Sequence, residues 1–283
     1  RACRAGYPSS CPFCSGLLAM SLETYWVRLR DGDAATRGDR ELVLEAVQDE
    51  GMCLEFASPA LRCDIEVVTA AVRQDPDALE FADEALRADP DLVSLAVSQK
   101  GSTLQFAADK LKSDKEVVLK AVRSDGLALN LAAEELRGDR EVVLAAVAQD
   151  GDALEIAAEQ FRADRDVVLS AVRLNGAILQ LASEDLRRDR EVVEAAVKFD
   201  GLALGFAGDE LRADRDLVLT AVRQHGGALE FASPELRADR ALVLDAINRT
   251  PKALAYALGG LQNDDDVLEF TREARCRIQA LGK

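Results

Sequence analysis

Three cysteines near the start of the chain are the residues whose type and spacing best suit metal binding. Cys11 and Cys14 form a Cys-Pro-Phe-Cys run, and Cys3 lies shortly before it. A Cys-x-x-Cys pair supplies two thiolates to zinc, but a structural zinc site needs four ligands, so Cys53 or Cys63 would have to complete the set. A redox dithiol is a further alternative, although that motif is typical of a βαβ context. We favour free thiols, with a metal-binding or redox module as the alternative.

The single histidine is the next candidate for chemistry. His225 stands in a column that holds aspartate or asparagine at 75, 125, 150, 175 and 200, and no serine or cysteine nucleophile motif accompanies it. A general base needs such a partner within hydrogen-bond reach. The sequence therefore predicts no enzyme, no catalytic residue and no cofactor.

A cationic column is the third candidate. It consists of Arg62, Arg87, Lys112, Arg137, Arg162, Arg187, Arg212 and Arg237. One interpretation is a track for an anion or for RNA, as in proteins that read one base per repeat. The other is a structural ladder, because acids recur in step at Glu41, Glu66, Asp91, Glu116, Glu141, Asp166, Glu191 and Asp216. RNA tracks also use stacking aromatics, which the column lacks, so we expect the ladder and no nucleic-acid partner.

A repeat must position all of these residues. A constant step of 25 residues separates the aspartates at 39, 64, 89, 114, 139, 164, 189, 214, 239 and 264. A leucine column from Leu54 to Leu254 and an alanine column from Ala57 to Ala257 keep the same step. Such a fixed period is the signature of a repeat architecture. Nine copies run from residue 39 to 263 without an insertion.

The repeat that begins at Asp214 predicts short helices. Asp214 suits a helix N-cap, and apolar residues follow at helical spacing over residues 217–222. The glycines Gly226 and Gly227 are expected to end this helix with a left-handed residue. The run Ser233-Pro234 then favours a new helix start, since serine caps a helix and proline fits its first position. Each repeat is therefore a helical hairpin plus a short third turn.

The repeat columns resemble the family catalogued as domain of unknown function 4116. The matching segments are D-R-E-V-V-L-A-A-V (139–147), G-x-A-L-x-x-A (151–157) and E-x-x-R-x-D (159–164), with Phe161 where leucine is usual. The resemblance extends from residue 39 to about 270 and implies a helical repeat protein. It implies no activity, cofactor or catalytic residue.

Composition agrees with one elongated repeat domain. The 283 residues are 48% hydrophobic and carry a net charge of −16, which disfavours nucleic acid and anionic membrane surfaces. Short helices must bury their apolar faces on their neighbours. We therefore predict an all-α solenoid of nine 25-residue helical hairpins with capped ends. The uneven cysteine spacing indicates a reducing, intracellular compartment, in the cytoplasm or an organelle lumen or stroma.

The two ends lie outside the repeat. Residues 1–38 form an N-terminal extension, in which the basic, acid-poor start fits either a transit segment or an artefactual start with Met20 as the true first residue. Tyr25 and Trp26 predict a helix that caps the first repeat. Residues 264–283 predict a C-terminal capping helix, because arginines gather in its second half.

Apolar departures from the repeat predict a binding surface. Leu174 and Phe199 replace the polar residue that usually ends the first helix, and Leu127 and Leu202 follow the turn glycine. If they face outward, they form an apolar patch of the kind that marks a partner site; the alternative is that a neighbouring loop covers them. We therefore expect a non-catalytic protein-binding scaffold or a structural subunit of a larger assembly.

Overall fold

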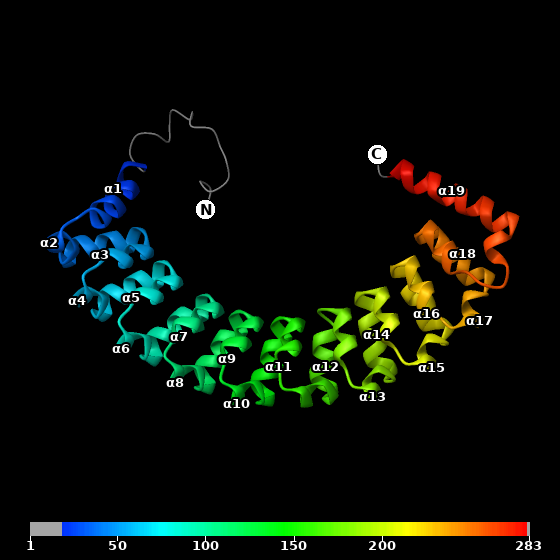
Figure 1. Ribbon diagram of the computed structural model, residues 1–283, viewed down its shortest axis with the longest axis horizontal. Coiled ribbons are helices and arrows are strands. Elements are labelled where there is room, and N and C mark those ends of the chain that lie inside the picture. The colour runs from blue at the N-terminus through cyan, green and yellow to red at the C-terminus, as the bar shows by residue number, and fades with distance from the viewer. Residues whose placement is uncertain (1–18, 282–283) are drawn as a thin grey trace. The chain divides into compact units, whose positions relative to one another are not determined.

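The protein is described by a computed structural model that covers residues 19–281 (Figure 1). Over this range it is built from α-helices and short 3-10 helices (η) and contains no strand. It divides into two compact units, of which the first ends at Ser124 and the second begins at Asp125. The all-α repeat architecture predicted from the sequence is therefore confirmed.

The first unit contains α1 (Ala19–Arg30), α2 (Ala34–Arg37), α3 (Arg40–Asp49), η1 (Gly51–Phe56), α4 (Pro59–Arg62), α5 (Ile65–Gln74), η2 (Pro76–Phe81), α6 (Glu84–Arg87), α7 (Pro90–Gln99), η3 (Gly101–Phe106), α8 (Asp109–Lys112) and α9 (Lys115–Ser124). The second contains η4 (Gly126–Leu131), α10 (Glu134–Arg137), α11 (Arg140–Gln149), η5 (Gly151–Glu155), η6 (Glu159–Ala163), α12 (Arg165–Val172), η7 (Gly176–Leu181), α13 (Glu184–Arg187), α14 (Arg190–Phe199), η8 (Gly201–Phe206), α15 (Asp209–Arg212), α16 (Arg215–Gln224), η9 (Gly226–Phe231), α17 (Pro234–Arg237), α18 (Arg240–Arg249), η10 (Pro251–Tyr256), η11 (Leu261–Asn263) and α19 (Asp265–Leu281).

Each long helix of the repeats begins directly after a predicted aspartate. The carboxylate of Asp214 accepts hydrogen bonds from the backbone N–H groups of Asp216 and Leu217, at 3.1 and 2.9 Å. Asp164 and Asp189 bond their own first turns in the same way. The negative charge also suits the positive end of the helix dipole. A local feature of the sequence therefore sets the start of every repeat.

The turn glycine acts differently from the prediction. Gly226 is not left-handed, since the positive φ angles among glycines of the described chain belong to Gly259 and Gly260. The helix instead ends in an extended residue, His225, with φ −142° and ψ 112°. A Cβ on Gly226 would lie 2.3 Å from the carbonyl oxygen of Ala246 in the next repeat. At Gly226 the absence of a Cβ lets the two backbones approach this closely.

The second helix of the hairpin is a 3-10 helix. It spans six residues in most repeats, which suits the tighter coil because 3-10 segments are short. The third helix begins as predicted, because the hydroxyl of Ser233 accepts from the N–H of Leu236 at 3.4 Å and Pro234 is the first helical residue. Each repeat thus consists of a long α-helix, a 3-10 helix and a short third helix.

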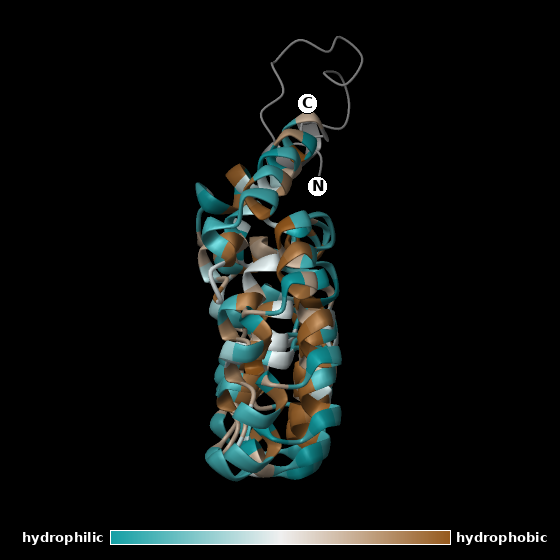
Figure 2. Ribbon diagram, turned by 90° about the vertical axis from the view of Figure 1, so that its right-hand side faces the viewer, coloured by the Kyte–Doolittle hydropathy of each residue, from teal (hydrophilic) through white to brown (hydrophobic). Residues whose placement is uncertain are grey.

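The core of each unit lies between the long helices and the 3-10 helices. Almost fully buried are the inward-facing residues of each long helix, such as Val43, Ala46 and Val47, and the leucine column from Leu54 to Leu229. Hydrophobic (brown) and hydrophilic (teal) segments alternate along the same helices in Figure 2, as expected for helices that bury one side. Backbone bonds also join the layers: the N–H of Asp83 donates to the Arg62 carbonyl at 3.0 Å, and that of Ser233 to the Arg212 carbonyl at 2.9 Å.

Helices outside the repeat cover the end layers. In the first unit, α1 places Trp26 edge-on against Phe56 with 5.4 Å between ring centroids, and the Tyr25 hydroxyl donates to Glu45 at 3.0 Å. In the second unit, α19 packs on α18 and η10 and buries Val267 and Ala274. None of the helices between residues 19 and 281 combines the length and hydrophobicity that a membrane crossing requires.

Candidate interaction surfaces

The cysteines divide into two groups. Cys3, Cys11 and Cys14 lie outside the described residues, so the proposed metal or redox role of this run stays a prediction. Within residues 19–281, no three metal-ligating side chains come together. Cys53 is buried, and this burial, followed by the nearby charge of Glu50, raises the pKa of its thiol to about 11. A protonated, buried thiol is unreactive.

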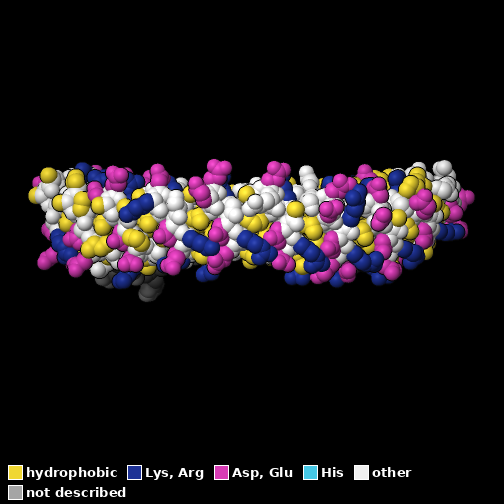
Figure 3. All heavy atoms as spheres, turned by 90° about the horizontal axis from the view of Figure 1, so that it is seen from below, with side chains coloured by type: hydrophobic (Ala, Val, Ile, Leu, Met, Phe, Trp, Pro, Cys, Tyr) yellow, Lys and Arg dark blue, Asp and Glu magenta, His cyan; other side chains and the backbone are white. Residues whose placement is uncertain are grey.

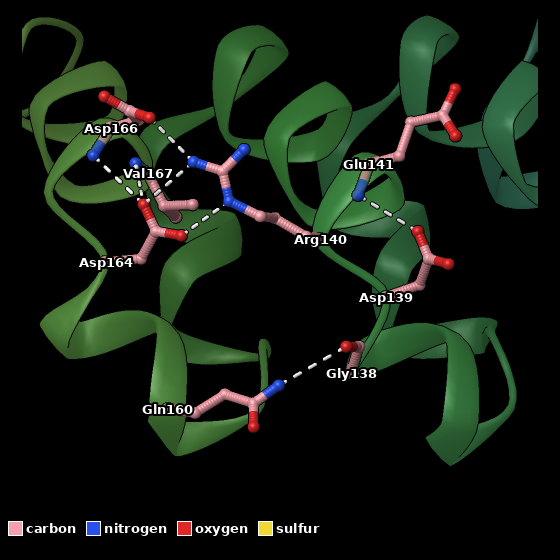
Figure 4. A network of polar contacts seen from close by, with 8 residues as sticks. All are labelled: Gly138, Asp139, Arg140, Glu141, Gln160, Asp164, Asp166 and Val167. Carbon is pink, nitrogen blue, oxygen red and sulfur yellow. Dashed lines mark hydrogen bonds and ion pairs between the residues drawn. The ribbon is translucent and has the colours of Figure 1, made fainter.

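An ion-pair ladder runs between repeats, but it uses a different arginine column from the predicted one. Arg140, directly after a capping aspartate, reaches the next repeat (Figure 4). Its Nε donates to Asp164 Oδ2 at 2.7 Å, and its Nη2 donates to Asp164 Oδ1 at 3.2 Å and Asp166 Oδ2 at 2.7 Å. One guanidinium thus binds two carboxylates of its neighbour, a favourable fork-like geometry.

The same bridge recurs in both units. Each bridge joins an arginine to the capping aspartate of the following repeat, and in most of them also to the acid two residues later: Arg40 with Asp64 and Glu66, Arg165 with Asp189 and Glu191, Arg190 with Asp214, Arg215 with Asp239, and Arg240 with Asp264 and Asp266. Hydrogen bonds from the arginines are the main cause that lowers the pKa of Asp64, Asp164 and Asp189.

The predicted cationic column has another role. Its members end the short third helices, and the carbonyl of Arg212, for example, accepts the bond between repeats described above. Arg162 pairs with Glu159 on its own helix, at 3.8 Å, rather than with Asp166. Asp166 faces Arg140 instead because it lies at the start of a long helix. The prediction that this column pairs with the periodic acids is therefore wrong.

The apolar residues singled out from the sequence are exposed. The exposed fractions are 43% for Leu127, 43% for Leu174, 56% for Phe199 and 37% for Leu202, so no described segment covers them. Leu174 and Phe199 belong to successive repeats, and Leu202 lies in the turn just after Phe199. Leu127 is separated from them by the whole repeat 139–163. We call these four residues the apolar patch.

Leu174 and Phe199 interrupt a second ladder, which is made of glutamines. Gln74 donates to the Asp49 carbonyl at 3.0 Å and accepts from the Gly51 N–H at 2.6 Å, so it ties its helix to the preceding turn. Gln149 and Gln224 make comparable bonds in the second unit. Leucine and phenylalanine side chains cannot form such bonds. The two repeats therefore give up an inter-repeat contact and gain an exposed apolar side chain.

Phe199 also lines a shallow groove. Its other lining residues are Arg173, Glu191, Glu194, Ala195 and Lys198, and the Lys198 ammonium pairs with Glu194 at 2.8 Å. The groove therefore combines an aromatic ring with charges of both signs. In Figure 3, acidic and basic side chains are likewise interspersed with hydrophobic ones on the face that is drawn.

Comparison with known families shows which repeat this is. The family model described as a domain of unknown function (DUF4116) matches seven overlapping segments: residues 39–87, 89–137, 115–162, 139–187, 164–212, 189–237 and 214–262. The chain belongs to this family. All but one of the DUF4116 matches begin at an aspartate that caps a long helix. No curated protein and no solved structure matches the chain.

The DUF4116 matches also place the apolar patch and the ladder within the repeats. Leu174, Phe199 and Leu202 all lie inside the match over residues 164–212, so they are variations on a regular repeat and not parts of an insertion. Sequence reasoning missed the role of the arginine that follows most of the capping aspartates. The recurrent Asp-Arg pair that begins at 39, 139, 164, 189, 214 and 239 was the available signal.

Proposed function

We propose that this chain is a non-catalytic protein-binding scaffold or a structural subunit of a larger assembly, whose partner contacts the apolar patch. The observation that carries this proposal is the pair Leu174 and Phe199. Both stand where a glutamine would tie two repeats together, and both are about half exposed. Apolar residues gathered on a surface often mark a partner site.

Energetics support a partner at this position. Fully burying a leucine or phenylalanine side chain stabilises a complex by about 1.5–3 kcal/mol. Half of that remains available at Leu174 and at Phe199, and the neighbouring Leu202 adds to it. Aromatic residues flanked by polar groups are frequent centres of binding energy. A protein partner is favoured over nucleic acid because the chain carries a net charge of −16.

The test restores the repeat pattern. In the double variant Leu174→Gln/Phe199→Gln, both positions regain the glutamine of the ladder, so folding should be preserved. The variant and the wild-type protein are used as baits under identical conditions in the source cells. A partner that is retained by the wild type and lost with the variant supports the proposal.

A matched control tests for nonspecific binding to exposed apolar side chains. Ile278 on α19 is 42% exposed and lies away from the patch, so Ile278→Gln removes a comparable apolar side chain. The partner must remain bound to this control. Equal binding by the wild type and the double variant would refute the proposal.

A further inference from the structure

The ion-pair ladder defines a receptor for a guanidinium group. In each complete bridge, the capping aspartate and the acid two residues later hold one arginine from the preceding repeat. Arg140 with Asp164 and Asp166 is the clearest case in the second unit. Arg40 with Asp64 and Glu66 shows the same arrangement in the first unit. The carboxylate pair is thus a recurring binding element of this chain.

In two successive repeats of the first unit, the position of this arginine holds no cation. Ile65 and Pro90 stand in its place, so the carboxylate pairs of the repeats that follow them, Asp89/Asp91 and Asp114/Glu116, receive no arginine from the preceding repeat. Both pairs keep the usual backbone arrangement: Asp89 accepts from Asp91 and Leu92 at 3.0 and 2.9 Å, and Asp114 accepts from Glu116 and Val117 at 2.9 and 3.2 Å. Within residues 19–281 these four acids form no ion pair, although the same positions hold a guanidinium in other repeats.

Ile65 is also part of a groove on its own helix. Ile65 is 46% exposed, and with Glu66, Thr69, Ala70 and Arg73 it lines a shallow groove along α5. Arg73 is roughly 12 Å further along the helix axis at 1.5 Å per residue, so the Ile65 end of the groove is apolar and acidic. An aliphatic side chain of a partner that covers Ile65 would remove apolar surface from water, which is favourable.

We propose that the surface formed by Ile65, Pro90, Asp89/Asp91 and Asp114/Glu116 binds an arginine-bearing segment of another protein. Its guanidinium groups occupy the places that arginines of this chain occupy in the complete bridges. Charge complementarity favours such a basic partner, because the chain carries a net charge of −16. Stacked helices lie about 8–10 Å apart, and a bound segment in the polyproline II conformation, with three residues per turn and about 3.1 Å per residue, presents two arginines three residues apart on one side at this spacing.

A peptide probe tests this surface on the full chain. The probe is a fluorescein-labelled Gly-Leu-Arg-Gly-Ser-Arg-Gly peptide, and binding is followed by fluorescence anisotropy. The variant Asp91→Asn/Glu116→Gln removes one carboxylate from each vacant pair and keeps both helix caps, so at least tenfold weaker binding is expected. The control Asp166→Asn/Glu191→Gln removes the same charge from occupied pairs and should bind as the wild type does.

A second variant restores an arginine of this chain at position 65. Ile65→Arg supplies the missing guanidinium to Asp89 and Asp91, so it should compete with the peptide and weaken binding at least tenfold. Ile65→Gln introduces a polar side chain without charge and should weaken binding much less. Equal weakening by the two charge-removing variants would indicate general electrostatic attraction and would overturn the proposal.

The proposal commits to another protein as the occupant. If the chain self-associates in sedimentation experiments, and Asp91→Asn/Glu116→Gln abolishes this, the occupant is a second copy and the proposal is wrong. The apolar patch lies in the other unit. Loss of peptide binding therefore does not depend on Leu174 or Phe199, and the two proposals fail separately.

Discussion

Replacing the turn glycine at 226 by alanine should increase the distance between the repeat 214–238 and the repeat 239–263. The added Cβ would lie 2.3 Å from the Ala246 carbonyl oxygen and 2.8 Å from the Thr250 Cβ. Favourable carbon contacts begin near 3.5 Å, so the layers must separate by about 1 Å. That oxygen also accepts from the Thr250 N–H at 2.8 Å, which ends the helix of the next repeat. We expect Gly226→Ala to lower the free energy of unfolding by about 1–3 kcal/mol, the usual cost of overpacking.

Gly138 provides the matched control in the same unit. Its φ of −97° suits any residue, and an added Cβ would meet nothing nearer than the Glu135 carbonyl oxygen at 3.4 Å. Alanine restricts the unfolded chain, so Gly138→Ala should stabilise the protein by about 0.4–1 kcal/mol. The same chemical change therefore has opposite signs at the two positions.

Urea denaturation followed by far-ultraviolet circular dichroism measures both effects. The midpoint should fall for Gly226→Ala and rise slightly for Gly138→Ala. Hydrogen exchange should locate the loss of protection in residues 226–250, because each repeat contacts mainly its neighbours. An unchanged midpoint for Gly226→Ala, or equal destabilisation by both variants, would refute the close-approach explanation.

Three further predictions follow from burial and charge. Phe199→Asp should abolish partner binding and leave the melting temperature unchanged, because surface substitutions usually alter stability by less than about 0.5 kcal/mol; a drop of many degrees would assign the ring to the core. Ala146→Phe, at a fully buried position, should destabilise by about 1–3 kcal/mol in urea titrations, and a tolerated ring would contradict tight packing. The arginine bridges lower the pKa of Asp64, Asp164 and Asp189, so their stabilisation is complete above pH about 4 and lost as pH falls through the lowered values. Urea midpoints measured from pH 7 downward check this, and a midpoint that rises below pH 4 would contradict it.

Local signals made the repeat boundaries predictable. Asp214 and the Ser233-Pro234 run act on the backbone groups beside them, so their effect does not depend on distant residues. The exposure of Leu174 and Phe199 was predictable for a related reason. They interrupt a column that is polar in other repeats, and polar columns mark the outer face of a periodic structure.

Contacts between repeats could not be assigned in the same way. Arg140 and Arg162 belong to columns with the same period, and only the offset between neighbouring layers decides which one reaches Asp166. A glycine after a helix suits both a left-handed residue and a close approach of two backbones. The position of the Ala246 carbonyl decides this for Gly226, and the sequence near Gly226 does not contain that information.

The backbone hydrogen bonds between layers make the repeat a module of fixed length. The N–H of Ser183 donates to the Arg162 carbonyl, and that of Gly208 donates to the Arg187 carbonyl in the same manner. If residues 164–188 were deleted, the Arg162 carbonyl would accept from the Gly208 N–H in place of the Ser183 N–H. The shorter protein would keep the native hydrogen bond between neighbouring repeats. Deleting one residue more or fewer would shift the following repeat out of register, so its buried side chains would no longer face the preceding repeat. The inter-layer hydrogen bonds are therefore compatible with the gain or loss of whole repeats.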